Sequence, residues 1–200
     1  MPDNSCKWRP EPDWANARLD APTLQVSAII GLPQRLVSGD IDRFLVRHEL
    51  AEVGALGLAS GERYAVRVAR DRLLAVGIPA SACADGWHDD GYGVTTVGSA
   101  FRVLQARGEG VPDLIARATT IDPNDPGPCA AMLFCGVMAT VYRYTDTETL
   151  RIHVDRGLGV YLWEWLEAQP LFRERLPALP AGKDFILEGA TRAGAGKKGS

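Results

Sequence analysis

The sequence predicts an α+β fold: two pseudo-repeated strand/helix units whose antiparallel sheets are covered by helices. Short runs that alternate between apolar and polar side chains recur along the chain, and tight turns separate neighbouring runs. A cycle of strand, helix, strand pair and helix occurs once before and once after about residue 92, although literal sequence repeats are absent. The predicted body spans residues 23–170, with halves of about 23–92 and 93–170.

The first half opens with a strand and a capped helix. Residues 24–30 alternate with period two, which is typical of a strand with one buried face. Asp40 is a good N-cap, and helical spacing continues from Ile41 through Glu52 until Gly54 closes it. The pattern therefore predicts one helix over most of this segment.

Two strand pairs follow along the chain. Residues 63–68 and 72–76 flank a short turn and predict a hairpin, after which Pro79 begins a short helical turn. Residues 93–97 and 101–105 have the same character, so we expect them to form a second strand pair.

The remaining elements are a helix and three strands. Residues 111–118 read as a helix with Pro112 at its start. The apolar run 130–142 exceeds the usual length of a strand, so Gly136 is predicted to divide it into two. A turn then leads into a strand at 150–154.

The composition is that of an ordinary globular protein, with a net charge of −3 and a pI of about 5.6. The basic residues are scattered, so we expect no nucleic-acid partner. The N-terminal segment contains no apolar core, and the longest apolar run is too short to cross a bilayer; we expect a cytoplasmic protein with no membrane contact. Residues 1–22 are predicted to form an irregular arm, and 171–200 a C-terminal extension and flexible tail.

Candidate catalytic and metal-binding residues are sparse. His48, His88 and His153 lie in three different predicted elements, and His153 is predicted to face solvent from its strand. The four cysteines form no CxxC pair, and Cys135 is expected to be a buried, inert thiol. From this pattern we predict no catalytic, cofactor-binding or metal-binding residue in the chain.

The last predicted helix, residues 156–168, is unusually aromatic. Its expected buried stripe consists of Leu158, Tyr161, Leu162, Trp165 and Leu166. Trp163 lies off that stripe on the side that carries Val160. Trp163 is either a large residue at the edge of the stripe or an aromatic anchor in a protein–protein contact, and we select Trp163 and Val160 as interface candidates.

Three stretches resemble a known family: Gly61–Gly77, Val103–Asp125 and Arg151–Ala168. Together they are similar to the gamma subunit of heterotetrameric sarcosine oxidase and of related N-methyl amino acid dehydrogenases, which share the fold of the folate-binding glycine cleavage T-protein. The pattern places Gly108, Val111, Ile115, Thr120 and Asp122 at family positions. The T-protein Asp-Val-Ser element corresponds here to residues 96–99, which contain no acid.

The resemblance implies a small, non-catalytic structural subunit of a flavin-dependent oxidoreductase complex. In the family, the complex converts sarcosine, O2 and tetrahydrofolate to glycine, 5,10-methylenetetrahydrofolate and H2O2. It further implies an alpha subunit as the main contact, with beta and delta subunits completing the heterotetramer. FAD, FMN, NAD, tetrahydrofolate and zinc are then expected in the partner subunits, and none in this chain.

Two other functions remain open. A free-standing folate-dependent aminomethyltransferase would require a carboxylate near residues 94–99 and a second T-protein domain. An iron–sulfur assembly factor or folate sensor of the same fold would be expected to carry a cysteine motif, which Cys83, Cys129 and Cys135 do not supply.

Overall fold

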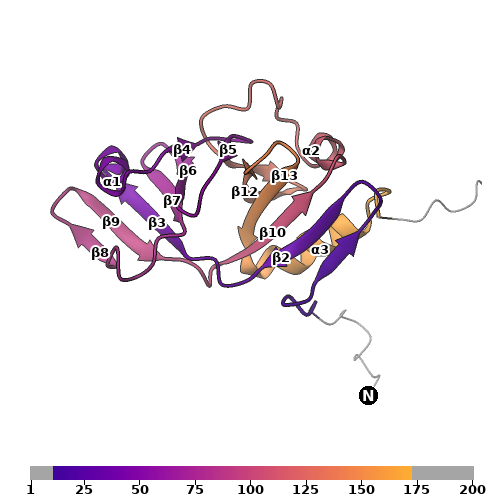
Figure 1. Cartoon of the computed structure of the whole chain (residues 1–200), viewed down its shortest axis with the longest axis horizontal. Coiled ribbons are helices and arrows are strands. Elements are labelled where there is room, and N and C mark those ends of the chain that lie inside the picture. Colours follow the sequence, from indigo (N-terminus) through magenta and orange to yellow (C-terminus); the bar gives the residue numbers. More distant parts are fainter. Residues whose placement is uncertain (1–10, 173–200) are drawn as a thin grey trace, which may run out of the picture.

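The computed structural model describes residues 11–172 and contains two β-sheets, three short α-helices and one 3-10 helix (Figure 1). The larger sheet has the strand order β1 (Arg18–Asp20), β2 (Gln25–Ile29), β10 (Phe101–Arg107), β13 (Thr149–Asp155), β12 (Val137–Tyr144) and β11 (Ala131–Phe134). A further short strand, β5 (Leu58–Ala59), pairs in parallel with β12. The smaller sheet has the order β4 (Glu52–Val53), β6 (Tyr64–Ala69), β7 (Arg72–Val76), β3 (Gln34–Gly39), β9 (Tyr92–Thr96) and β8 (Gly86–His88). Nearly all pairs are antiparallel, so the fold is α+β as predicted.

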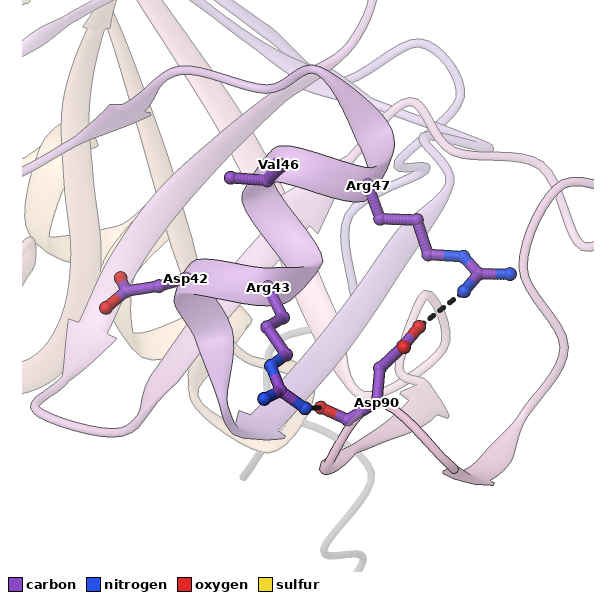
Figure 2. Close-up of a pocket in the computed structure, with 5 residues that line it drawn as sticks. All are labelled: Asp42, Arg43, Val46, Arg47 and Asp90. Carbon is purple, nitrogen blue, oxygen red and sulfur yellow. Dashed lines mark hydrogen bonds and ion pairs between the residues drawn. The ribbon is translucent and has the colours of Figure 1, made fainter.

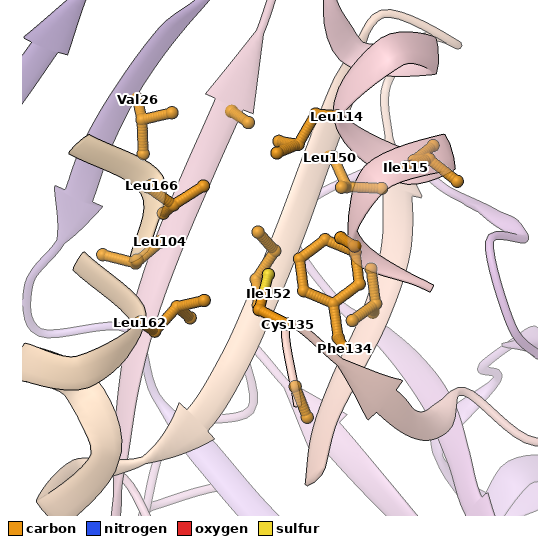
Figure 3. Packing of buried hydrophobic residues seen from close by; sticks show 14 of the residues in the cluster. Val26, Leu104, Leu114, Ile115, Phe134, Cys135, Leu150, Ile152, Leu162 and Leu166 are labelled. Atoms are coloured by element: carbon orange, nitrogen blue, oxygen red, sulfur yellow. The ribbon is translucent and has the colours of Figure 1, made fainter. Parts of the chain in front are cut away.

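The helices are eight or nine residues long and cover only part of the sheets. They are α1 (Ile41–His48), α2 (Val111–Ala118) and α3 (Gly159–Glu167), the last preceded by the 3-10 helix η1 (Arg156–Leu158). Phe44 of α1 packs on the smaller sheet, whereas α2 and α3 pack on the larger one. Figure 3 shows Leu162 and Leu166 of α3, and Leu114 of α2, meeting the apolar face of the larger sheet.

A third apolar cluster joins the two sheets. Val66, Leu74 and Val76 of the smaller sheet are fully buried against Tyr142 of the larger sheet and Ala130. Alternate residues of β6 and β7 thus serve two cores, because successive strand side chains point to opposite faces. The smaller sheet is therefore apolar on both faces, and one of its faces lies against the larger sheet.

Several predicted elements are confirmed. The hairpin of β6 and β7, helix α2, and strands β2 and β13 lie where the sequence placed them. Asp40 caps α1 by accepting a hydrogen bond from the Arg43 amide at 3.1 Å. Cys135 and Gly136, both with positive φ, form the tight turn that divides the apolar run into β11 and β12.

The extent predicted for the first helix is wrong. Helix α1 ends at His48 because Glu49 adopts a left-handed conformation with φ 53° and donates its amide hydrogen to the carbonyls of Leu45 and Val46. The chain beyond Glu49 is extended, and Glu52 pairs with Ala65 of β6. The spacing of residues 49–52 is compatible with a helix, but pairing with β6 makes this part of the chain extended.

The predicted pairing of residues 93–97 with 101–105 is also wrong. Strand β9 pairs with β3 and β8, whereas β10 pairs with β2 and β13 in the other sheet. Strand β3 was not predicted from the sequence, although it is an inner strand of the smaller sheet. Once β3 occupies the position next to β9, the chain after Thr96 continues into the larger sheet.

The segment before residue 23 is more regular than predicted. Strand β1 pairs with β2, and Trp14 is buried with 8% of its surface exposed. Strands β2 and β5, which precede residue 92, lie in the larger sheet together with strands from the second half. The tail predicted for 171–200 falls almost entirely outside the described residues.

Candidate functional site

A buried polar cluster lies where the two sheets meet, and it is the largest concentration of titratable side chains in the described interior. Its members come from β3, β6, β12 and β13, and they are Gln34, Tyr64, Tyr142, Arg151 and His153. All five are at most 9% exposed. Buried polar groups are costly unless hydrogen-bonded, so the pairing of each one determines what the cluster can do.

The hydrogen bonds of this cluster run in one direction. His153 Nδ1 lies 2.6 Å from Gln34 Oε1, and His153 Nε2 lies 2.7 Å from the Tyr142 hydroxyl. Because an amide carbonyl only accepts, Nδ1 donates to Gln34, and the neutral imidazole accepts from Tyr142 at Nε2.

The same donor-to-acceptor direction continues from Tyr142 to Tyr64 and Arg151. Since Tyr142 donates to His153, it accepts from the Tyr64 hydroxyl at 2.8 Å. Tyr64 in turn accepts from Arg151 Nη1 at 2.5 Å. The donors thus point from Arg151 through both tyrosines and the imidazole to Gln34.

Arg151 supplies the charge of the cluster without a carboxylate partner among the described residues. Its guanidinium lies 3.3 Å from the ring centroid of Tyr144, and its Nε donates to Gln105 Oε1 at 3.3 Å. An aromatic face stabilises a cation that has lost its hydration, so Tyr144 offsets part of the desolvation of Arg151.

The predicted exposure of His153 is wrong. His153 is 1% exposed, and burial, reinforced by the Arg151 charge, lowers its pKa to about 3. Burial also raises the pKa values of Tyr64 and, more strongly, of Tyr142 above the ordinary tyrosine value. All three groups are therefore neutral near pH 7, and the cluster is a hydrogen-bonded connection between the two sheets.

Four of these five residues were not candidates from the sequence; only His153 was. Thr149, Arg151 and His153 alternate with apolar neighbours along β13, which is the pattern of a strand with one face in solvent. That face is covered by the smaller sheet, whose strands precede β13 in sequence by dozens of residues. The alternation of polar and apolar residues could have indicated that these side chains share one face of β13. It does not indicate what covers that face.

The other histidines lie apart from this cluster. His88 ends β8 and stacks on Tyr92, while His48 lies on α1 against Phe44. Among residues 11–172, no group of three or more His, Cys, Asp or Glu side chains is arranged to hold a metal ion. Cys135 is buried as expected, and burial raises the pKa of its thiol strongly.

Helix α3 presents a different face to the core from the one predicted. Its buried residues are Gly159, Leu162, Trp163 and Leu166, whereas Leu158 and Tyr161 are 39% and 47% exposed. The buried stripe is therefore displaced from the predicted stripe toward Trp163. A Cβ on Gly159 would lie 3.2 Å from the Arg102 side chain, so the missing side chain allows α3 to approach β10 closely.

Trp163 is 7% exposed and packs edge-on against Trp14, with ring centroids 5.7 Å apart. Its aromatic surface is thus covered by the chain's own N-terminal segment, and Val160 is only partly buried beside it. The interface role of Trp163 and Val160 stays a prediction, and Trp163 now has an intramolecular partner in Trp14.

Large exposed apolar side chains occur elsewhere. Leu133 and Met138 face each other across β11 and β12 and are 61% and 60% exposed. Trp87, on the edge strand β8, is 73% exposed. Such residues at sheet edges are candidates for contact with another protein.

A shallow hollow of about 380 Å³ lies on the outer side of α1 (Figure 2). Val46, one of its lining residues, is 79% exposed. Both flanking arginines are engaged: Arg43 donates to the Asp90 carbonyl at 3.3 Å, and Arg47 forms an ion pair with the Asp90 carboxylate. The hollow is therefore an open surface feature whose two arginines are already engaged by Asp90.

One carboxylate lies near residues 94–99, where the sequence showed none. Asp85 accepts hydrogen bonds from Thr96 Oγ1 at 2.8 Å and from Arg35 Nη1 at 2.9 Å. It reaches β9 from the loop before β8, so its proximity depends on the fold. Its oxygen is held by a buried arginine and a threonine, which makes it part of an ion pair at the sheet surface.

No protein-family model matches the sequence, and no curated protein matches it. Among solved structures, the fold is similar to a chain of the heterotetrameric sarcosine oxidase from Corynebacterium sp. U-96, solved in complex with pyrrole 2-carboxylate. The TM-score is 0.58 at 13% sequence identity, and the match covers 72% of this chain and 81% of that chain. At this identity the likeness establishes a shared fold.

No helix in the described part of the chain combines the length and apolar character that a membrane crossing requires.

Proposed function

We propose that this protein is a small non-catalytic structural subunit of a multi-subunit, flavin-dependent enzyme that oxidatively demethylates an N-methyl amino acid such as sarcosine. The observation that carries the proposal is the fold shared with a chain of a heterotetrameric sarcosine oxidase. The aligned part is a larger share of that chain than of this one, so the matched chain is somewhat shorter than this one and is itself small.

The interior of the chain supports a structural role. The buried cluster around His153 pairs its hydrogen-bonding groups with one another, and this pairing holds the two sheets together. A folded body of this kind can present a rigid surface to larger chains. In the proposed complex, a gamma-type role places the main contact on an alpha subunit, with beta and delta subunits beside it. The flavins, NAD, tetrahydrofolate and zinc belong to those partners in this proposal.

Co-expression with the genes that neighbour its own, followed by size-exclusion chromatography and a flavin absorbance spectrum, tests this function. We expect the chain to co-elute with larger flavin-containing chains, and the purified complex to produce peroxide or reduce an acceptor when sarcosine is added. A stable monomer that is active alone, or stoichiometric flavin on the lone purified chain, would overturn the proposal.

The exposed pair Leu133 and Met138 allows a sharper version of this experiment. If a larger chain packs on the β11–β12 hairpin, replacing both residues by lysine weakens co-elution without unfolding the chain, because both side chains are already mostly in solvent. Val46→Lys is the control, since Val46 is also an apolar, mostly exposed side chain but lies on α1. Equal co-elution of both variants would place the contact elsewhere.

A free-standing folate-dependent aminomethyltransferase is the second candidate, because Asp85 supplies a carboxylate beside β9. Titration of the lone chain with tetrahydrofolate distinguishes the two functions. Saturable binding that is lost in Asp85→Asn would favour the transferase, whereas the subunit proposal predicts no binding that depends on Asp85.

A further inference from the structure

The chain passes between the two sheets at two connections that lie close together. Residues 30–33 lead from β2 to β3, and residues 97–100 lead from β9 to β10. Figure 1 shows the two connections side by side at the lower edge of the view, where the chain passes between the two sheets. A Cβ on Gly98 would lie 3.6 Å from the Leu32 carbonyl, and the Val97 amide donates to the Gln34 carbonyl at 2.9 Å, so the connections are in contact.

A pocket of about 240 Å³ lies between these connections and the end of β10. Ser99, Gly31 and Gly98 are among the residues that line it. Gly31 has φ +75°, and a Cβ there would meet nothing within 4 Å, so its backbone borders open space. Glycines at such positions allow backbone amides to approach a ligand closely.

Two arginines, Arg102 and Arg156, line the same pocket. No acidic residue is among the described residues that line it. Arg156 is exposed and forms no ion pair with any residue of the 11–172 segment. The pocket therefore carries an excess of positive charge.

Arg102 is held in place by Trp14 and Glu11, but one of its hydrogen-bond donors has no acceptor among residues 11–172. Its guanidinium lies 4.2 Å from the Trp14 ring centroid, and Nη2 lies 3.5 Å from the Glu11 carboxylate. Its Nε is buried without a hydrogen-bond partner. Burial, together with the nearby Arg156 charge, lowers the pKa of Arg102. A bound anion would offset the repulsion between Arg102 and Arg156, and it could accept a hydrogen bond from Arg102 Nε.

We propose that this pocket binds a small anion, a phosphate or carboxylate group, between Arg102, Arg156 and Ser99. Paired guanidiniums recognise both groups, because each presents oxygens that accept charge-assisted hydrogen bonds. Phosphate and carboxylate share this chemistry and differ in source, either a phosphorylated metabolite or a small organic acid. The site adds to the proposed structural role and does not depend on it.

The test uses the purified full-length chain and two probes, inorganic phosphate and acetate, each titrated against chloride at constant ionic strength. Backbone amide signals of Gly31, Gly98 and Ser99, and the Nε–H signal of Arg102, are followed by nuclear magnetic resonance. We expect at least one probe to shift these signals saturably. Saturation by phosphate alone identifies a phosphate site, and saturation by acetate alone identifies a carboxylate site.

Arg156→Gln removes one guanidinium from an exposed position and leaves the packing of Arg102 intact. It should weaken binding about tenfold, as the loss of a charge-assisted contact does. Arg117→Gln, on the exposed side of α2, is the matched control and should bind as the unmodified chain does. No saturable shift beyond chloride with either probe, or unchanged binding in Arg156→Gln, would overturn the proposal.

Discussion

Gln34 and His153, separated by 119 residues in sequence, are joined by a hydrogen bond of 2.6 Å that links the smaller sheet to the larger one. Both side chains are buried, at 3% and 1% exposure. The bond orients the imidazole so that its other nitrogen accepts from Tyr142. The relative position of the two sheets therefore depends on a polar contact as well as on the apolar cluster around it.

Gln34→Ala should destabilise the chain by about 1–3 kcal/mol, because His153 Nδ1–H would be left buried without its acceptor. Urea unfolding at pH 7 measures the change. Gln25→Ala is the matched control: Gln25 lies on β2 near the surface, bonded only to Asp20 in an exposed pair, and should cost less than about 0.5 kcal/mol. Equal losses in the two variants would show that the Gln34–His153 bond contributes little.

Stability should fall as the pH falls below about 6.5. The folded pKa of His153 is about 3, below the ordinary histidine value of 6.5, so between these pH values the unfolded chain binds a proton that the folded chain does not. The stabilisation is complete above pH 6.5 and is lost toward pH 3, by up to about 1.4 kcal/mol per pH unit. His48, whose pKa is also lowered by burial, acts in the same direction.

Urea unfolding at pH 7, 6, 5 and 4 measures this slope. In His153→Gln the contribution of the imidazole is absent, so the variant should lose less stability per pH unit than the unmodified chain. Parallel curves for the two proteins between pH 6 and 4 would contradict a buried neutral imidazole.

Trp14→Ala should cost about 3 kcal/mol, because Trp14 is buried against Trp163 and Arg102 and its removal opens the edge of the core. Trp163 should also become more accessible to solvent, so acrylamide should quench the tryptophan fluorescence of the variant more strongly. Trp87→Ala removes an equally large side chain that is 73% exposed and should cost less than about 1 kcal/mol. If Trp14→Ala were as mild as Trp87→Ala, the N-terminal segment would not be part of the folded core.

Gly77→Ala and Gly61→Ala form a matched pair, since the two glycines have φ of +80° and +79°. At Gly61 a Cβ meets nothing within 4 Å, so alanine should cost only the backbone strain, about 1 kcal/mol. At Gly77 a Cβ would lie 1.8 Å from the Glu62 carbonyl oxygen, so the β6–β7 hairpin must shift and the loss should reach about 3 kcal/mol or more. Thermal unfolding of both variants measures the difference, and similar losses would contradict the close approach at Gly77.

The sequence by itself determined most of the local structure. Period-two alternation located β2, β6, β7 and β13, Asp40 marked the start of α1, and Gly136 marked the turn between β11 and β12. These features depend on backbone conformation and on neighbours within a few residues, which the local sequence encodes.

Only the tertiary structure decided which strands pair and what covers each face. The sequence predicted a strand at 150–154 with His153 facing solvent, but the smaller sheet that buries this face comes from residues more than fifty positions earlier. In the same way, Trp14 and the missing side chain of Gly159 displaced the buried stripe of α3 toward Trp163. Periodicity groups residues onto a face, whereas burial requires a second surface, and long-range packing supplies that surface.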